Sequence, residues 1–84
     1  MCKGFIYGVY LEGCTNLRYF YEIEDAIEWC ENEIDKEVGN LYNHLRYCVD
    51  EKSVINGSVR QCLVGYNGGF GNIMKYEIKA IDVY

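Results

Sequence analysis

The fold is decided by residues 23–38, which read IEDAIEWCENEIDKEV. Apolar side chains recur in this segment at intervals of three and four residues, the spacing of one face of an α-helix. Acidic residues crowd its first turn, where they favour the partial positive charge of a helix N-terminus. Gly39 and Asn40 then supply a C-terminal stop signal. The segment therefore predicts an amphipathic helix over about 23–38, whose apolar face consists of Ile23, Ala26, Ile27, Cys30, Ile34 and Val38.

Strand patterns lie on both sides of this helix. Residues 3–12 alternate with apolar groups on both faces, which indicates a strand in the interior of a sheet. A turn at 12–16 precedes a short returning strand at 17–21. After the helix, residues 59–66 and 74–80 predict two more strands. In the last strand we expect Met74, Tyr76, Ile78 and Ala80 to face inwards and Lys75, Glu77 and Lys79 to face outwards.

The segment between the helix and residue 58 is ambiguous. Residues 40–50 fit either a helix or a strand, and we expect a helical turn near 41–45 followed by a strand. Residues 50–58 read as a polar connection that ends in Asn56-Gly57, a strong hairpin signal. The whole pattern predicts one α+β domain over 1–84: a small antiparallel sheet of 4–5 strands with one main helix packed on one face.

Five cysteines raise the question of disulfides. Their number is odd, and no charged segment followed by an apolar segment opens the chain. We therefore expect free thiols in a reducing compartment, the cytoplasm, or the host cytoplasm if the protein is encoded by a phage. No apolar run of about 18 residues occurs, so we expect no membrane partner.

Negative charge is concentrated in the predicted helix. It carries, with the residue before it, eight of the thirteen acidic residues and one lysine. Glu24, Glu28, Glu31 and Asp35 fall on one stripe at about 100° per residue. Such an acidic stripe would attract a protein with a basic groove, including a nucleic-acid-binding enzyme. The alternative is a solvated helix face that has no partner. Direct binding of nucleic acid is disfavoured, because it requires clustered lysine and arginine.

Trp29 falls on the polar side of the same helical wheel, between Asp25, Glu33 and Lys36. Tryptophan is enriched among interface residues that contribute most to binding, so Trp29 is a candidate anchor. The alternative is that the segment after Gly39 covers it. The predicted partner-binding residues are Glu24, Asp25, Glu28, Trp29, Glu31 and Asp35.

Residues 65–72 form a glycine-rich segment between two predicted strands. Its backbone N–H groups could surround an anion, and its aromatic rings could stack on a base. The predicted ligand-binding residues are Tyr66, Gly68, Gly69, Phe70 and Gly71. A strand follows the segment instead of a helix, which argues against a dinucleotide-binding motif. The alternative is a flexible hairpin turn.

No arrangement of residues predicts catalysis. His44 is the only histidine, and nothing in the sequence orients it towards Cys48 as a base beside a nucleophile. Metal-ligand spacings such as C-x-x-C are absent from the sequence. We therefore expect no enzyme activity, no cofactor and no metal.

In size, acidity, tyrosine content and lack of catalytic motifs the chain resembles the small accessory proteins of phages and mobile elements. Many of those block host defence nucleases, as anti-CRISPR proteins do. This resemblance implies a non-enzymatic, protein-binding inhibitor whose acidic helix mimics nucleic acid and docks in a basic groove. A second hypothesis is a small-ligand binder that sequesters a nucleotide through residues 65–72. A third is a self-associating structural module, such as a homodimer.

Overall fold

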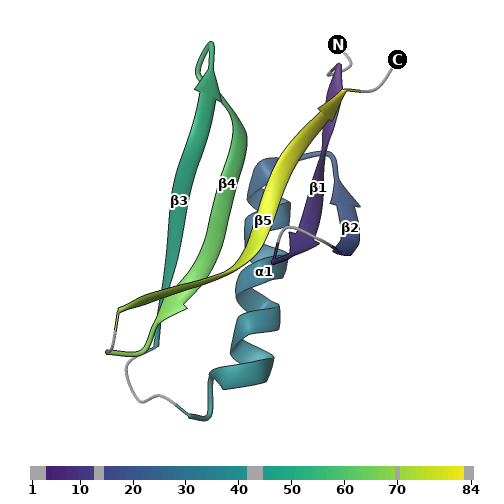
Figure 1. Cartoon of the computed structure of the whole chain (residues 1–84). Coiled ribbons are helices and arrows are strands. Elements are labelled where there is room, and N and C mark those ends of the chain that lie inside the picture. Colours follow the sequence, from purple (N-terminus) through teal and green to yellow (C-terminus); the bar gives the residue numbers. More distant parts are fainter. Residues whose placement is uncertain (1–3, 13–14, 42–44, 70, 83–84) are drawn as a thin grey trace.

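The computed structural model describes residues 4–12, 15–41, 45–69 and 71–82. They form an α+β fold in which one helix packs against a five-stranded antiparallel sheet of strand order β2-β1-β5-β4-β3 (Figure 1). The predicted fold class and the predicted helix are both confirmed. In chain order the elements are β1 (Phe5–Leu11), β2 (Thr15–Phe20), α1 (Ile23–Val38), β3 (Arg46–Ile55), β4 (Ser58–Asn67) and β5 (Asn72–Asp82).

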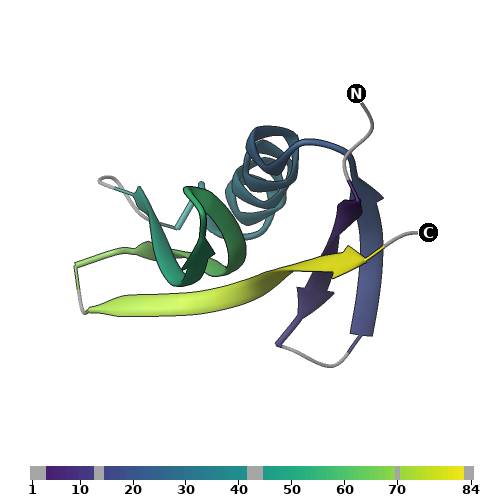
Figure 2. The ribbon, with the colours of Figure 1, turned by 90° about the horizontal axis from the view of Figure 1, so that it is seen from above.

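The core lies between α1 and one face of the twisted sheet (Figure 2). The apolar face of α1 meets alternate residues of β1, β4 and β5, because successive strand side chains point to opposite faces. Each large apolar side chain buried in this way stabilises the fold by about 1.5–3 kcal/mol. The largest side chains that are fully buried are Val9, Cys30, Ile34, Cys62, Val64 and Ile78.

β3 begins near the predicted position but is longer than expected. Residues 50–55, expected to belong to a polar connection, form its second half and pair with β4. β3 is an edge strand whose side chains are mostly exposed, so polar residues such as Asp50 and Lys52 cost little there. The hairpin turn itself is confirmed, since Asn56 and Gly57 both have positive φ, 52° and 79°. The helical turn expected near 41–45 cannot be compared with the structure, because residues 42–44 lie outside the described residues.

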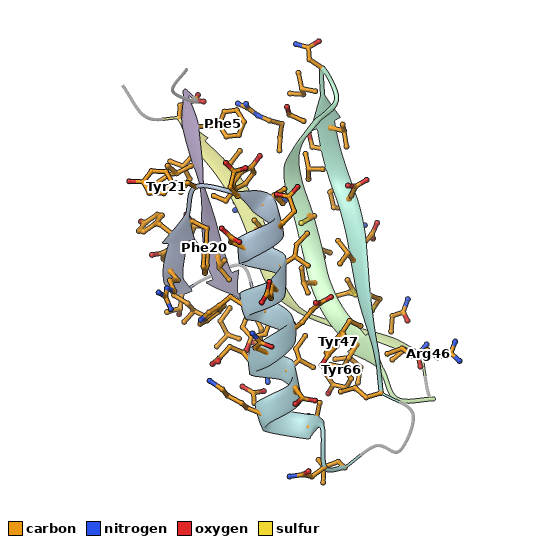
Figure 3. All side chains as sticks on the ribbon, turned by 180° about the vertical axis from the view of Figure 1, so that it is seen from behind. Phe5, Phe20, Tyr21, Arg46, Tyr47 and Tyr66 are labelled. Atoms are coloured by element: carbon orange, nitrogen blue, oxygen red, sulfur yellow. The ribbon has the colours of Figure 1, made fainter. Side chains whose placement is uncertain are left out.

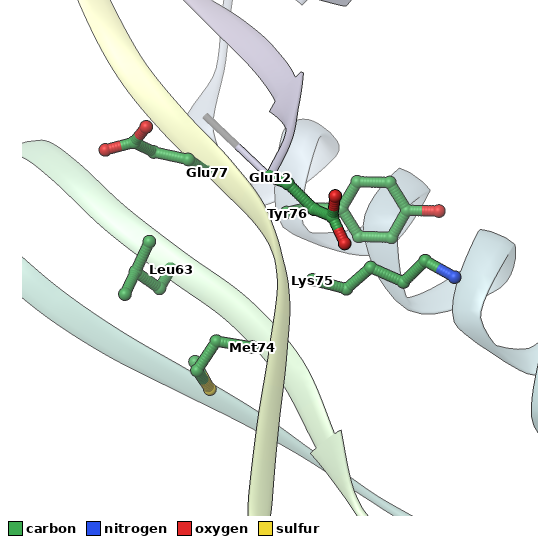
Figure 4. Close-up of a pocket in the computed structure, with 6 residues that line it drawn as sticks. All are labelled: Glu12, Leu63, Met74, Lys75, Tyr76 and Glu77. Carbon is green, nitrogen blue, oxygen red and sulfur yellow. The ribbon is translucent and has the colours of Figure 1, made fainter. Parts of the chain in front are cut away.

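A β-bulge inverts part of the expected alternation in β5. Val64 pairs with Tyr76 and Gly65 pairs with Met74, so Lys75 is the extra residue. Met74 therefore points away from α1, where the Cys48 thiol donates a hydrogen bond to its sulfur at 3.6 Å. Lys75 points towards α1 (Figure 4) and pairs with an α1 carboxylate, that of Glu37. The predicted orientations of Met74 and Lys75 were wrong, because a bulge shifts the two-residue period by one.

Gly65 permits the close approach of β4 to β5 at this bulge. A Cβ atom at Gly65 would overlap the carbonyl oxygen of Ile73 and lie 2.6 Å from the Cα of Met74. Both are backbone atoms, which cannot rotate away. We expect Gly65→Ala to lower the free energy of unfolding by about 3 kcal/mol or more, measured by urea denaturation. Gly4→Ala is the control, because nothing lies within 4 Å of a Cβ there. An unaltered stability of Gly65→Ala would disprove this strand register.

Candidate protein-binding surface

The exposed acidic residues of α1 lie between β3 on one flank of the helix and β2 on the other. Glu24 and Asp35 lie towards β3, where Glu24 lines a groove and Asp35 accepts a hydrogen bond from the Tyr47 hydroxyl at 3.5 Å. Figure 3 shows Tyr47 on the side of the β3–β4 hairpin that faces α1. Asp25 and Glu28 lie towards β2 and line a depression of about 270 Å³ together with Arg18. The predicted partner-binding carboxylates thus span the exposed side of α1, with Glu24 and Asp35 nearer β3 and Asp25 and Glu28 nearer β2.

Few of these carboxylates are neutralised. Two ion pairs involve α1 among the described residues, Lys36 with Glu33 at 2.9 Å and Lys75 with Glu37. The other carboxylates of the helix have no basic partner in the described part of the chain. α1 therefore presents uncompensated negative charge to solvent, which raises the local concentration of cations and cationic proteins. The helix carboxylates with no lysine or arginine partner among the residues that the structure describes are Glu24, Asp25, Glu28, Glu31 and Asp35.

Trp29 is partly buried, although the helical wheel places it on the polar side of α1. Its ring centroid lies 6.2 Å from that of Phe20 on β2 and 6.0 Å from that of Tyr76 on β5. The covering elements are thus β2 and β5, not the segment after Gly39. Because the sheet twists around α1, a residue at the flank of the buried stripe also meets sheet side chains. The ring therefore contributes to packing, and its role as a binding anchor stays a prediction.

A groove separates the N-terminal half of α1 from the β3–β4 hairpin; we call it the α1–hairpin groove. Its volume is about 380 Å³. Its floor is apolar and its rim is acidic. The sequence pattern does not reveal this groove, because polar residues at 50–58 predict a connection, although the Asn-Gly signal favours two strands of equal length around the turn. Its floor includes Ile23, Ile27, Val49, Val59 and Cys62, and its rim includes Glu22, Glu24 and Glu51.

The glycine-rich segment forms the turn between β4 and β5. The Asn67 side chain accepts a hydrogen bond from the N–H of Gly69 at 2.7 Å and donates one to Asn72 at 3.0 Å. This N–H is therefore engaged within the turn. Tyr66 does not reach the turn surface, because its side chain is 8% exposed and belongs to the core. Phe70 lies outside the described residues.

The sequence predicts neither catalysis nor a metal site, and of the weak pair His44 and Cys48 the structure describes one residue. His44 lies outside the described residues, and Cys48 stands in a strand with its thiol directed at Met74. No group of three histidine, cysteine, aspartate or glutamate side chains could hold a metal ion in the described part of the chain. The absence of enzyme activity stays a prediction.

The cysteines that the structure describes are free thiols, while Cys2 and Cys14 lie outside the described residues. Burial raises the pKa of Cys30 to about 12, and the neighbouring Cys62, Glu31 and Glu33 add to this effect. Burial likewise raises the pKa of Cys62 to about 11, with a contribution from Glu51. Both thiols are therefore protonated and unreactive at neutral pH.

Comparison of the chain with protein-family models, with curated proteins and with solved structures found no match. Within the described residues, no helix is both long enough and apolar enough to cross a bilayer. The function must therefore be inferred from the surface of the molecule.

Replacement of Trp29 tests its contribution to packing. We expect Trp29→Ala to lower the free energy of unfolding by about 2–3 kcal/mol, because its contacts with Phe20 and Tyr76 are lost. Trp29→Phe keeps an aromatic ring at this position and should lose less. Thermal denaturation of the two variants beside the unaltered protein measures both effects. Equal stability of all three proteins would show that the ring is not part of the fold.

The raised pKa values of the two buried thiols predict that the free energy of unfolding falls at alkaline pH. Their folded-state pKa values, about 12 for Cys30 and about 11 for Cys62, lie above the ordinary value of 9.0. Their contribution to stability is therefore complete below pH 9 and is lost as the pH rises towards these values. Urea denaturation at about pH 8 and about pH 10 should show this loss. The double variant Cys30→Ala, Cys62→Ala should show a smaller loss, and an equal loss would refute the assignment.

Proposed function

We propose that this protein binds a partner protein that presents a basic groove, and that the acidic side chains of α1 make the contact. The observation that carries this proposal is the set of carboxylates without a basic partner among the described residues, on a helix whose opposite face is held in the core. Ala26, Cys30 and Ile34 are fully buried in that face. The carboxylates are therefore presented by a rigid element, and little conformational entropy of the backbone is lost on binding.

The spacing of the charges favours a partner that otherwise binds nucleic acid. Glu24, Glu28, Glu31 and Asp35 extend over about 16 Å of helix axis, at a rise of about 1.5 Å per residue. This corresponds to one negative charge per about 5 Å, against one per about 3.4 Å along a strand of duplex DNA. A groove lined by lysine and arginine for phosphate groups could pair with such a row of carboxylates.

Occupation of such a groove excludes nucleic acid, so the consequence of binding is inhibition of the partner. On this proposal the protein is not an enzyme, and its target is a nucleic-acid-binding enzyme such as a host defence nuclease. A phage or mobile element that encodes the protein would deliver it to the host cytoplasm, where such nucleases act.

Charge reversal on α1 tests the proposal with immobilised polylysine as the basic probe. Association should slow steeply as salt concentration rises, because exposed charges are screened. We expect the double variant Glu28→Lys, Glu31→Lys to bind about tenfold more weakly, mainly through a slower on-rate. Surface plasmon resonance at several salt concentrations measures both effects.

The matched control is the double variant Glu12→Lys, Asp50→Lys. It changes the net charge by the same amount at two exposed positions outside α1. We expect it to retain most of the binding. If both double variants bind equally weakly, binding depends on net charge alone and α1 is not the contact surface. Binding that does not respond to salt would also refute the proposal.

A further inference from the structure

The α1–hairpin groove is an apolar surface that α1 leaves uncovered. Val49 of β3 pairs with Val64 of β4, so both side chains point to the face on which α1 lies. Val64 is fully buried beneath α1, whereas Val49, one strand further out, is 41% exposed. One helix is too narrow to cover the sheet as far as β3. Ile23 and Ile27, at the edge of the buried stripe, complete the apolar floor and remain partly exposed.

The hairpin extends this surface beyond the helix. In Figures 1 and 3 the tip of the β3–β4 hairpin lies past the N-terminal end of α1. Gly57 and Ser58, at the tip, also line the groove. The result is a depression between α1 and the hairpin, and concave surfaces of this kind receive side chains of a peptide segment.

The charge around the groove restricts what can bind there. Glu24 and Glu51 line it from opposite sides, and neither is paired with a basic side chain in the described part of the chain. No lysine or arginine lines it either, within the described residues. An anionic ligand would be repelled, whereas a ligand that combines apolar and cationic groups would be attracted. Glu24 also begins the acidic stripe of α1, so groove and stripe form one continuous surface.

We propose that the α1–hairpin groove is an anchoring site for a basic amphipathic segment of the partner protein. An apolar side chain of that segment occupies the floor beside Ile27 and Val49. Flanking lysine or arginine side chains contact Glu24 and Glu51. This inference rests on the proposed function and assigns the two surfaces different roles in binding. The acidic stripe of α1 raises the association rate, and the groove lowers the dissociation rate because apolar surface is buried there.

Two synthetic peptides test the inference on the full chain. The first is a short amphipathic peptide of lysine and leucine, and the second has serine in place of every leucine at the same net charge. Isothermal calorimetry measures both affinities, and amide chemical shifts locate both binding sites. We expect the leucine peptide to bind about tenfold more tightly and to shift the amides of Ile27, Val49 and Val59.

Two pairs of variants separate the groove from its surroundings. Val49→Ser should remove most of the preference for the leucine peptide, whereas Val54→Ser, on the same strand but outside the groove, should not. Glu51→Gln should weaken binding of the leucine peptide about threefold, whereas Asp50→Asn, its neighbour on the opposite sheet face, should not. All four positions are exposed, so the fold should tolerate each change, and dispersion of the amide spectrum checks this.

The outcomes distinguish this inference from the proposed function. Equal, salt-sensitive binding of the two peptides, with shifts confined to α1, would overturn the groove as an anchor and leave the acidic stripe in place. Salt-insensitive binding of both peptides would overturn the proposed function itself. Concentration-dependent dimerisation without peptide, abolished by Val49→Ser but not by Val54→Ser, would show that a second copy of the chain occupies the groove, and would also overturn the inference.

Discussion

Every other feature of this structure depends on the packing of one helical stripe against one sheet face. Ala26, Cys30 and Ile34 of α1 are fully buried, and across from them lie fully buried residues of β1, β4 and β5. A chain of 84 residues has a small core, so little else can compensate if this contact is lost. The contact also holds α1 rigid, and a rigid helix is what keeps its outward carboxylates in a defined row.

The same packing creates the surfaces through which the protein could act. One helix cannot cover five strands, and the edge strand β3 therefore keeps part of its α1-facing side chains in solvent, as Val49 shows. This uncovered margin adjoins acidic residues of α1 that have no basic partner in the part of the chain that the structure describes. Charge and apolar surface thus occur side by side, an arrangement that suits electrostatic steering followed by desolvation of an anchor.

Much of the fold was predictable from local patterns, and the exceptions have specific causes. The bounds of α1 and the Asn56-Gly57 turn follow from short-range signals, periodicity and turn chemistry. The second half of β3 escaped prediction because an exposed edge strand needs no apolar alternation around residues such as Asp50. Met74 and Lys75 were assigned to the wrong faces because the bulge at Gly65 depends on pairing between two strands, which no single strand encodes.

For the candidate site, residue spacing along α1 was enough to place Glu24, Glu28, Glu31 and Asp35 on one stripe, because neighbours three and four residues apart share a helix face. Spacing within one helix could not show what surrounds it. Tertiary packing decided that Trp29 lies against Phe20 and Tyr76 and that β3 stands beside an open groove. The physical reason is that burial at the flank of a helix depends on the twist and width of the sheet beneath it, a property of five strands together.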